Sequence, residues 1–439
     1  MIKAKAKQKF ESIKDQTLYK YLEDDSDKKL IDDLSSNYYL SLQELRQLME
    51  IFIDFKMWED NSLLPIIMLQ SNNLHLSKEQ LLNSIHQKYK ETKESTITIK
   101  EYPNLNKNKH HLITSNIQTT KTNSGKKISG MCPVASTKTL CCNLRTIDVI
   151  QNCAFGCSYC SIQTFYNKNQ IMVEDNLDEK LDAITSDLNP LKLYHFGVGQ
   201  SSDSLLFGNI NGTLDSLMNW ALKNPNILLE FKTKSNNIDY FIKKSIPTNV
   251  FVSWTLNTET IIKNEEHLTA SLDERLQAAR RLLDHKMKVA FHFHPIVYYK
   301  NWKQEYQSVI SRLQDNFHPS EILFISLGTI TMIKPAIQEM RIKGAKGLLK
   351  SKILQMPMEK VYGRLSYPME IKKEMFTQVY SMFNSNSNSN WTDHIFFYLC
   401  MEPRECWDFI NINKESIPSS NENLESELCL HIHQKMLSC

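Results

Sequence analysis

The chain has 439 residues, of which 41% are hydrophobic, and its formal net charge is only +3. This length exceeds the roughly 150 residues of an average domain, so the chain can hold one large catalytic domain with appended segments. The near-neutral charge excludes a protein that binds polyanions over its whole surface.

The beginning of the chain, Met1-Ile-Lys-Ala-Lys, lacks the apolar segment of a signal peptide. No apolar run approaches the roughly 20 residues that a membrane helix needs. Ten cysteines would indicate disulfides only in a small secreted protein. We therefore expect a cytoplasmic protein without a membrane partner, in a compartment that keeps thiols reduced.

Residues 1–95 are predicted to form a helical N-terminal domain, because apolar residues recur at helical spacing over 40–55. Residues 96–144 are predicted to be a basic connector with one short strand at 96–100. The stretch 88–130 contains nine lysines and three glutamates. A solvated linker is the favoured interpretation, and a contact with nucleic-acid phosphates is the alternative.

From residue 145 the pattern alternates between strands and helices. Strands are predicted at 147–152, 192–198, 227–232, 250–255, 288–294 and 322–327. Helices are predicted between them, for instance at 176–188 and 271–286, the second opening with the capping box of Ser271 and Glu274. This order predicts a parallel sheet curled into a partial barrel over 145–370.

Residues 371–439 are predicted to be a C-terminal α/β extension. It comprises a helix at 371–383, a low-complexity loop at 384–390, a strand at 394–400 and a helix at 403–412.

Three cysteines directly follow the first predicted strand of the barrel. Cys153, Cys157 and Cys160 have the spacing C-x3-C-x2-C. Three thiolates this close can hold three irons of one [4Fe-4S] cluster and leave the fourth iron open. A zinc site or an electron-carrying cluster would want a fourth ligand. A zinc knuckle or three unrelated buried thiols remain the alternatives.

The predicted strands end in small or polar residues, and reactive groups of α/β barrels gather at such ends. Turn formation is the alternative explanation for each of these residues taken alone. His292 and His294 alternate with Phe291 and Phe293, so both point to one side of their strand. That side is either the barrel interior, where they would face the pocket, or the helix-covered face.

The cysteine motif, with Tyr159 before its last cysteine, resembles the radical S-adenosylmethionine superfamily. Within it the chain is similar to the spore photoproduct lyase family from about residue 145 to 410. The similar passages are Cys160-Ser-Ile-Gln-Thr164, Phe231-Lys-Thr-Lys234, 271–279 with 289–295 and Trp302, and Tyr362-Gly-Arg364.

The resemblance implies an α/β fold, a partial (β/α)6 TIM-type barrel of that superfamily with the N-terminal helical extension. It implies a [4Fe-4S] cluster on the catalytic Cys153, Cys157 and Cys160 and an electron donor such as flavodoxin or ferredoxin. The reduced cluster would cleave S-adenosylmethionine to methionine and a 5′-deoxyadenosyl radical. The residues implied to contact S-adenosylmethionine are Tyr159, Ser201, Asp203, Lys234 and Thr255, with Lys234 a candidate for its carboxylate.

Lyases of this family take a hydrogen from a cross-linked thymine dimer and carry a donor cysteine after the second strand. Gln200 stands at that position here, and no cysteine occurs between Cys160 and Cys400. We therefore expect a lyase-like radical enzyme whose substrate is open. The alternatives are a true spore photoproduct lyase in DNA repair, and a non-catalytic iron–sulfur redox sensor or nucleic-acid-binding protein.

The remaining cysteines have no recognisable pattern. Cys132, Cys141 and Cys142 have the spacing C-x8-C-C, which matches no cluster motif that we can justify. An auxiliary cluster is conceivable, but buried core thiols are favoured. Cys141, Cys142 or Cys400 would replace the donor only if the fold brings one of them into the pocket.

Overall fold

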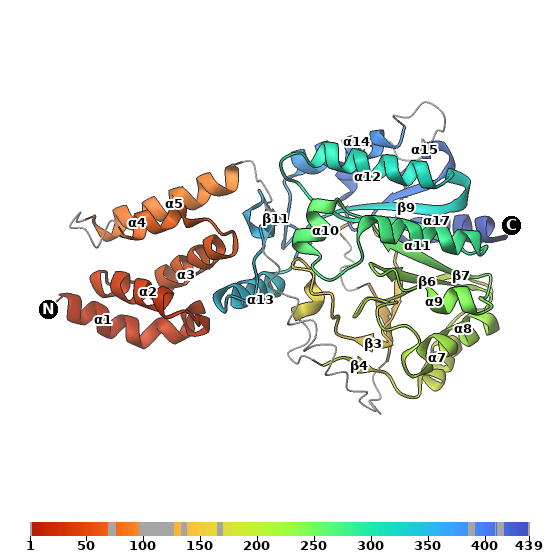
Figure 1. Cartoon of the computed structure of the whole chain (residues 1–439), viewed down its shortest axis with the longest axis horizontal. Coiled ribbons are helices and arrows are strands. Elements are labelled where there is room, and N and C mark those ends of the chain that lie inside the picture. Colours follow the sequence, from red (N-terminus) through yellow and green to blue (C-terminus); the bar gives the residue numbers. More distant parts are fainter. Residues whose placement is uncertain are drawn as a thin grey trace. The chain divides into compact units, whose positions relative to one another are not determined.

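The structure, a computed structural model, describes residues 2–68, 76–95, 127–132, 138–164, 170–384, 391–408, 410 and 417–437 (Figure 1). The chain forms two compact units. The smaller comprises Met1–Leu105, Ser158–Thr164 and Met332–Leu365, and the larger comprises the rest. The strand predicted at 96–100 and the loop residues 385–390 lie outside the described residues.

The smaller unit is mainly helical. Its helices are α1 (Ile2–Ile13), η1 (Lys14–Gln16), η2 (Leu18–Tyr21), α2 (Asp25–Asn37), α3 (Leu42–Met57), η3 (Asn61–Leu63), α4 (Leu64–Met68), α5 (Lys78–Glu94), η4 (Ser161–Thr164), α13 (Lys334–Ala345) and η7 (Ile353–Gln355). A capping box of Ser41 and Glu44 fixes the start of α3. The helix predicted from the apolar spacing over 40–55 is confirmed.

Helix α13 belongs to the smaller unit because it packs on α3. The Arg341 guanidinium donates to both oxygens of the fully buried Asp54 at 2.9 and 2.8 Å, and Tyr89 donates its hydroxyl to the same carboxylate at 2.8 Å. A side chain at Gly344 would overlap Met57. Residues 332–365 thus pack with the helical unit. The sequence analysis predicted that 145–370 form one barrel domain. The domain boundaries at 95, 144 and 370 stay predictions.

The larger unit is built on a curled sheet of eight strands in the order β1-β2-β5-β6-β7-β8-β9-β13. Their bounds are β1 (Ser129–Met131), β2 (Arg145–Ile147), β5 (Tyr194–Val198), β6 (Ile227–Thr233), β7 (Val250–Thr255), β8 (Lys288–Ile296), β9 (Ile322–Thr329) and β13 (Phe396–Leu399). All neighbours are parallel except β1 and β2. The predicted α/β half-barrel is confirmed, and the strand of the C-terminal extension joins the same sheet.

The curl brings opposite edges of the sheet together. Leu140, just before β2, forms an antiparallel bridge with Glu402, which follows β13, and its N–H donates to the Glu402 carbonyl at 3.0 Å. Glu402 is buried and pairs with the equally buried Lys372. The segment before the first parallel strand therefore lies beside the end of the last.

The first parallel strand is shorter than the prediction of 147–152. It ends at Ile147, and β3 (Ile150–Gln151) pairs with β4 (Met172–Val173) in a separate two-stranded sheet. The chain leaves the large sheet at Asp148, and Asn152 has a left-handed backbone with φ 71°. These two residues redirect the chain into the cysteine loop.

Helices cover the outer face of the sheet (Figure 1). The helices of the larger unit besides α17 are α7 (Leu177–Ser186), η5 (Ile210–Gly212), α8 (Thr213–Lys223), α9 (Asp239–Lys243), α10 (Glu259–Glu265), α11 (Leu272–Asp284), α12 (Trp302–Asn316), η6 (Pro319–Glu321), α14 (Met369–Met382), α15 (Trp391–His394) and α16 (Arg404–Asp408). Short strands β10 (Thr331–Met332), β11 (Glu359–Val361) and β12 (Arg364–Ser366) form a third sheet.

Helix α17 (Asn421–Leu437) covers the amino ends of the strands. The Lys435 ammonium donates to the Ile322 carbonyl at 2.7 Å, and the His431 ring contacts the Leu323 carbonyl at 2.8 Å. The opposite, carboxyl ends of the strands are where the site was predicted. Within the described residues, no helix is long and apolar enough to cross a membrane.

Candidate active site

The cysteine loop runs from Asn152 to η4. The Asn152 side chain accepts the Cys153 N–H at 2.9 Å and donates to the Gln170 carbonyl at 3.0 Å, which anchors the start of the loop. Gly156 has φ +68°, a conformation that favours glycine, and a side chain there would meet only open space. Cys157 is buried, whereas Cys153, Cys160 and Tyr159 are half-buried.

The loop passes from one unit to the other. Cys153 and Cys157 belong to the larger unit, and Tyr159 and Cys160 belong to the smaller. In the described part of the chain, no three His, Cys, Asp or Glu side chains are arranged so that they could hold a metal ion. The assignment of a cluster therefore rests on the donor chemistry and spacing of the motif and is treated below as a proposal.

Asp203 ties two neighbouring strand ends together. Its Oδ1 accepts from the Thr233 hydroxyl at 2.7 Å and from two backbone N–H groups, those of Leu205 and Leu206, at 3.1 Å each. Its Oδ2 accepts the Lys234 N–H at 2.7 Å. Burial raises the pKa of Asp203, although these hydrogen bonds oppose the shift. The lone pairs of this carboxylate are largely committed to these hydrogen bonds, one of which fixes the backbone of Lys234.

Ser201 is held by a residue that the sequence analysis did not single out. Its backbone N–H donates to Asp148 Oδ1 at 2.9 Å. Burial raises the pKa of Asp148, and the hydrogen bonds to Ser201 lower it. The carboxylate that ends β2 thus fixes the loop that follows β5.

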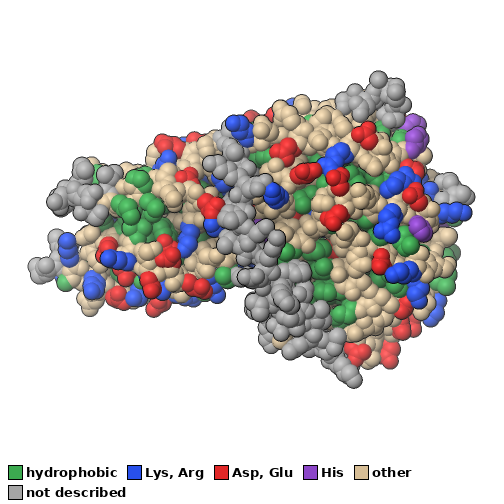
Figure 2. Space-filling model, in the orientation of Figure 1, with side chains coloured by type: hydrophobic (Ala, Val, Ile, Leu, Met, Phe, Trp, Pro, Cys, Tyr) green, Lys and Arg blue, Asp and Glu red, His purple; other side chains and the backbone are tan. Residues whose placement is uncertain are grey.

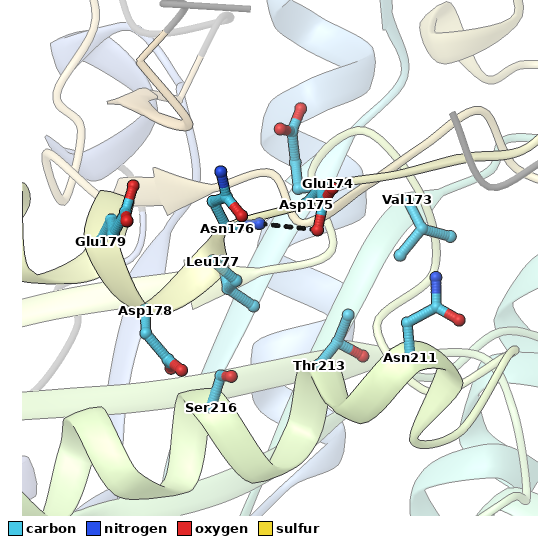
Figure 3. Close-up of a pocket in the computed structure, with 10 residues that line it drawn as sticks. All are labelled: Val173, Glu174, Asp175, Asn176, Leu177, Asp178, Glu179, Asn211, Thr213 and Ser216. Atoms are coloured by element: carbon cyan, nitrogen blue, oxygen red, sulfur yellow. Dashed lines mark hydrogen bonds between the residues drawn. The ribbon is translucent and has the colours of Figure 1, made fainter. Parts of the chain in front are cut away.

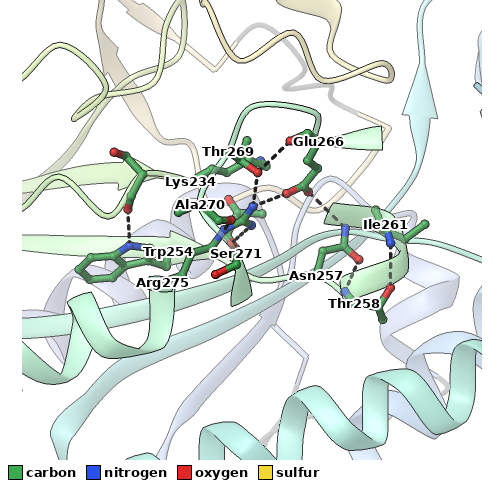
Figure 4. A network of polar contacts seen from close by, with 12 residues as sticks. Lys234, Trp254, Asn257, Thr258, Ile261, Glu266, Thr269, Ala270, Ser271 and Arg275 are labelled. Atoms are coloured by element: carbon green, nitrogen blue, oxygen red, sulfur yellow. Dashed lines mark hydrogen bonds and ion pairs between the residues drawn. The ribbon is translucent and has the colours of Figure 1, made fainter. Parts of the chain in front are cut away.

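A buried network fixes the ends of β6 and β7 (Figure 4). Arg275 on α11 is fully buried and donates to the Thr255 carbonyl at 2.8 Å, the Ala270 carbonyl at 2.9 Å and the Glu266 carboxylate at 2.6 Å. The Ala270 N–H donates in turn to the Lys234 carbonyl at 3.0 Å. Two predicted site residues, Lys234 and Thr255, are therefore linked through one guanidinium.

The interior of the barrel contains a polar network centred on Glu230 of β6, which is 1% exposed. Its carboxylate lies 2.7 Å from Nε2 of both His195 and His292, and accepts the Ser253 hydroxyl at 2.5 Å. Phe293, on the opposite side of β8 from His292, packs on Tyr306 of α12. The two histidines of β8 consequently face the barrel interior, one of the two positions left open by the sequence.

The network reaches the carboxyl ends of the strands. Ser326 Oγ lies 2.5 Å from His292 Nδ1 and 3.0 Å from His294 Nε2. His294 Nδ1 lies 3.2 Å from the Lys232 ammonium. Burial, then the charge of Lys232, holds the pKa of His294 well below its usual range. A neutral His294 accepts from Lys232 and donates onward to Ser326, so the Lys232 ammonium is held on the inner face of the barrel.

The buried histidines predict a pH dependence of stability. Burial, followed by the charge of Lys232, lowers the pKa of His292 from 6.5 to about 4. The folded state disfavours the imidazolium of His292. The contribution of the neutral ring to the free energy of unfolding is therefore complete above pH 6.5 and is lost as the pH falls toward 4. We expect the melting temperature to fall across this window, and His292→Gln to flatten the fall in scanning calorimetry. The exposed His285 offers the matched control, since His285→Gln should leave the slope unchanged.

Four thiols from distant parts of the sequence, here called the thiol quartet, lie near this network: Cys132, Cys141, Cys142 and Cys400. A hydrogen bond to Cys141, then burial, raises the pKa of Cys142 well above its usual value, and the charges of Cys400 and Cys132 add to the shift. Burial raises the pKa of Cys400 likewise, against the charge of Lys232.

Cys400 occupies the carboxyl end of β13. A Cβ atom built on Gly328 of β9 would lie 3.5 Å from the Cys400 Cβ and 3.1 Å from the His294 ring. Cys400 is half-buried, whereas Cys141 and Cys142 are buried. Sequence reasoning considered Cys400 but had no signal that places it beside His294, because the bridge that closes the barrel is a tertiary contact.

A separate pocket of about 510 Å³ lies beside β4, α7 and α8 (Figure 3). Four carboxylates line it: Glu174, Asp175, Asp178 and Glu179. Glu174 is already paired with Lys180 and accepts from Gln151 at 3.1 Å. None of the predicted site residues lines this pocket.

The sequence of the chain is similar to that of a known protein family. The profile of the spore photoproduct lyase family matches residues 141–360. The spore photoproduct lyase of Clostridium acetobutylicum is 26% identical over 181 residues, which cover 40% of this chain and 54% of the relative. That of Bacillus subtilis is 24% identical over 166 residues, covering 37% and 48%. The chain thus spans about half the length of the curated relatives it matches.

Solved structures show the same fold. A spore photoproduct lyase complexed with a dinucleoside spore photoproduct superposes with a TM-score of 0.55 at 17% identity, covering 72% of this chain and 93% of that chain. A variant with bound S-adenosylmethionine and the dinucleoside gives a TM-score of 0.54 with the same coverage. Because the family profile spans half of the 439 residues, the chain belongs to the spore photoproduct lyase family.

Proposed function

We propose that the protein is a radical S-adenosylmethionine enzyme with spore photoproduct lyase-like chemistry, whose substrate is open. The observation that carries the proposal is the C-x3-C-x2-C motif of Cys153, Cys157 and Cys160, which follows the first parallel strand within the matched region. These thiols would hold three irons of a [4Fe-4S] cluster, and the motif itself offers no fourth cysteine. When bound, the cluster supplies the electron that cleaves S-adenosylmethionine to methionine and a 5′-deoxyadenosyl radical.

The remaining predicted residues would hold S-adenosylmethionine. Lys234, positioned by Asp203 and by the Arg275 network, would pair with its carboxylate. Thr255 ends β7 and Ser201 lies in the loop after β5, and both would accept or donate hydrogen bonds. Tyr159 would pack near the adenine. A flavodoxin or ferredoxin would reduce the cluster, and a cytoplasmic location would keep it intact.

The experiment that tests the proposal is anaerobic reconstitution with iron and sulfide, reduction, and addition of S-adenosylmethionine. We expect 5′-deoxyadenosine by liquid chromatography. No 5′-deoxyadenosine from a protein with a verified cluster, with or without cell extract, would contradict the proposal.

A true DNA repair lyase is the second candidate, because the curated relatives and the solved neighbours are spore photoproduct lyases. The position that corresponds by resemblance to the donor cysteine holds the half-buried Gln200. An amide is a poor hydrogen-atom donor, so this candidate requires another thiol. Incubation with a dinucleoside spore photoproduct decides it, since restored thymidines would support repair and an unchanged substrate would exclude it.

Cys400 is the thiol best placed to give a hydrogen atom to a carbon radical in the barrel. Its raised pKa keeps the S–H bond intact at neutral pH, and it is less buried than Cys141 and Cys142. Transfer would break S–H, form C–H and leave a thiyl radical, which one electron from the cluster's reductant and one proton from solvent would return to the thiol.

If Cys400 is the donor, its replacement should lower the amount of deuterium that 5′-deoxyadenosine takes up from heavy water. In heavy water the thiol carries deuterium, so 5′-deoxyadenosine formed without substrate should be partly monodeuterated. Cys400→Ala should lower that fraction several-fold by mass spectrometry. Cys429→Ala, a buried thiol on α17, is the control. Equal deuteration in all three proteins would rule Cys400 out as the donor.

A further inference from the structure

The smaller unit contains a cationic pocket that the proposed radical chemistry does not use. It has a volume of about 290 Å³, and η2, α3 and α13 contribute to its walls. Four basic side chains line it: Lys20, Arg46, Lys334 and Arg341. Glu50 is the one carboxylate among the residues that line it. Three elements thus contribute basic side chains to the lining of one small volume.

One of these cations is neutralised and three are not. Arg341 donates to Glu50 at 2.5 Å and to both oxygens of Asp54, so its charge is compensated and its guanidinium is fixed. Lys20, Arg46 and Lys334 form no salt bridge with any carboxylate in the described ranges and are exposed. The pocket therefore carries a net positive charge of its own.

The positive charge extends along one rim of the pocket. The ammonium of Lys20 lies 4.9 Å and that of Lys346 lies 5.6 Å from the centre of the Tyr21 ring, which also lines the pocket. Basic and acidic side chains are otherwise interspersed over the face of the molecule in Figure 2. An anion is thus favoured at this pocket by a local arrangement rather than by a broad basic face.

We infer that this pocket binds a backbone phosphate of a polynucleotide. Converging cations with a neutral donor, the Gln338 amide, suit a tetrahedral phosphate that accepts several hydrogen bonds. Lys346, which does not line the pocket but lies 5.6 Å from the centre of the Tyr21 ring at its rim, would reach a second phosphate, which a mononucleotide lacks. The inference extends the proposed function by giving the helical unit a partner, and it does not depend on radical chemistry.

The test measures binding of a fluorescein-labelled single-stranded 12-mer to the full-length reconstituted protein by anisotropy, between 50 and 200 mM KCl. The variant is Arg46→Gln with Lys334→Gln. The matched control is Lys5→Gln with Lys29→Gln, which makes the same charge change at exposed positions of the same unit outside the pocket. Loss of the phosphate held in the pocket should weaken binding at least tenfold and lower the slope of log K against log salt by about 0.7, the value for one phosphate of a single strand. The control should stay within twofold of wild type.

Other outcomes overturn the inference. Equal losses of affinity for the 12-mer in both double variants would show that the net charge of the protein, and not this pocket, sets the affinity. Displacement of the 12-mer by adenosine monophosphate or inorganic phosphate at equal concentration would make the pocket a small-phosphate site. Displacement by polyglutamate would point to an acidic protein instead. Iron content and 5′-deoxyadenosine, measured on the same preparations, separate a failed inference from a failed proposed function, because the pocket variant should leave both unchanged.

Discussion

Replacing Cys157 with alanine is expected to abolish the cleavage of S-adenosylmethionine by the reduced protein, with a loss of at least about 100-fold in 5′-deoxyadenosine. The motif supplies three thiolates, and a cluster deprived of one loses the geometry that leaves a single iron open. Cys157 is buried and lies between the other two cysteines of the motif in the loop. Iron content and the visible absorbance of the reconstituted protein should fall in parallel.

The control for this prediction is Cys132→Ala. Cys132 belongs to the thiol quartet and is half-buried, but it is not part of the motif. It should leave iron content and 5′-deoxyadenosine near the wild-type values. An equal loss in both variants would mean that iron is held by the quartet, and retention of activity in Cys157→Ala would contradict the radical mechanism.

Replacing Arg275 with methionine should have the largest effect on stability, about 3–5 kcal/mol, because it leaves the carboxylate of Glu266 buried without its partner. Both side chains are 0% exposed, and the guanidinium donates to four groups of the protein: the carbonyls of Thr255 and Ala270, the Thr269 hydroxyl and the Glu266 carboxylate. The loss should appear as a lower melting temperature of the larger unit in calorimetry. The affinity for S-adenosylmethionine should also fall, because Lys234 and Thr255 lose their common support.

Arg280 on the same helix supplies the matched control. It pairs with Glu321 and Asp284 but is partly exposed, with 31% of its side chain accessible. Arg280→Met should change stability by no more than about 1 kcal/mol, as for other surface ion pairs. Adding Glu266→Gln to Arg275→Met should recover part of the loss, because the unpaired charge is then removed. Equal falls in melting temperature for Arg275→Met and Arg280→Met would show that the buried Arg275 network stabilises the protein no more than a surface ion pair does.

Several strand-end positions named from the sequence are joined in the fold, but not all in the way expected. The oxygens of Asp203 accept from Thr233, Lys234 and two further N–H groups, and its contact with S-adenosylmethionine stays a prediction. Lys232, which was not singled out, lies 3.2 Å from His294 on the inner face. The alternating pattern of a strand predicts from the sequence which of its residues share a face. The contacts of each side chain depend on the neighbouring strands, which the sequence pattern does not give.

The sequence by itself determined the cysteine motif, the order of the parallel strands and the capped helices between them. These features depend on residues close together in the chain, where spacing alone sets geometry. The tertiary structure alone decided that Arg341 pairs with Asp54 and that Cys400 lies with Cys141 and Cys142. It also decided that Glu230 joins His195 and His292. Each of these contacts joins segments far apart in the sequence, and only the curl of the sheet and the packing of α13 on α3 bring them within bonding distance.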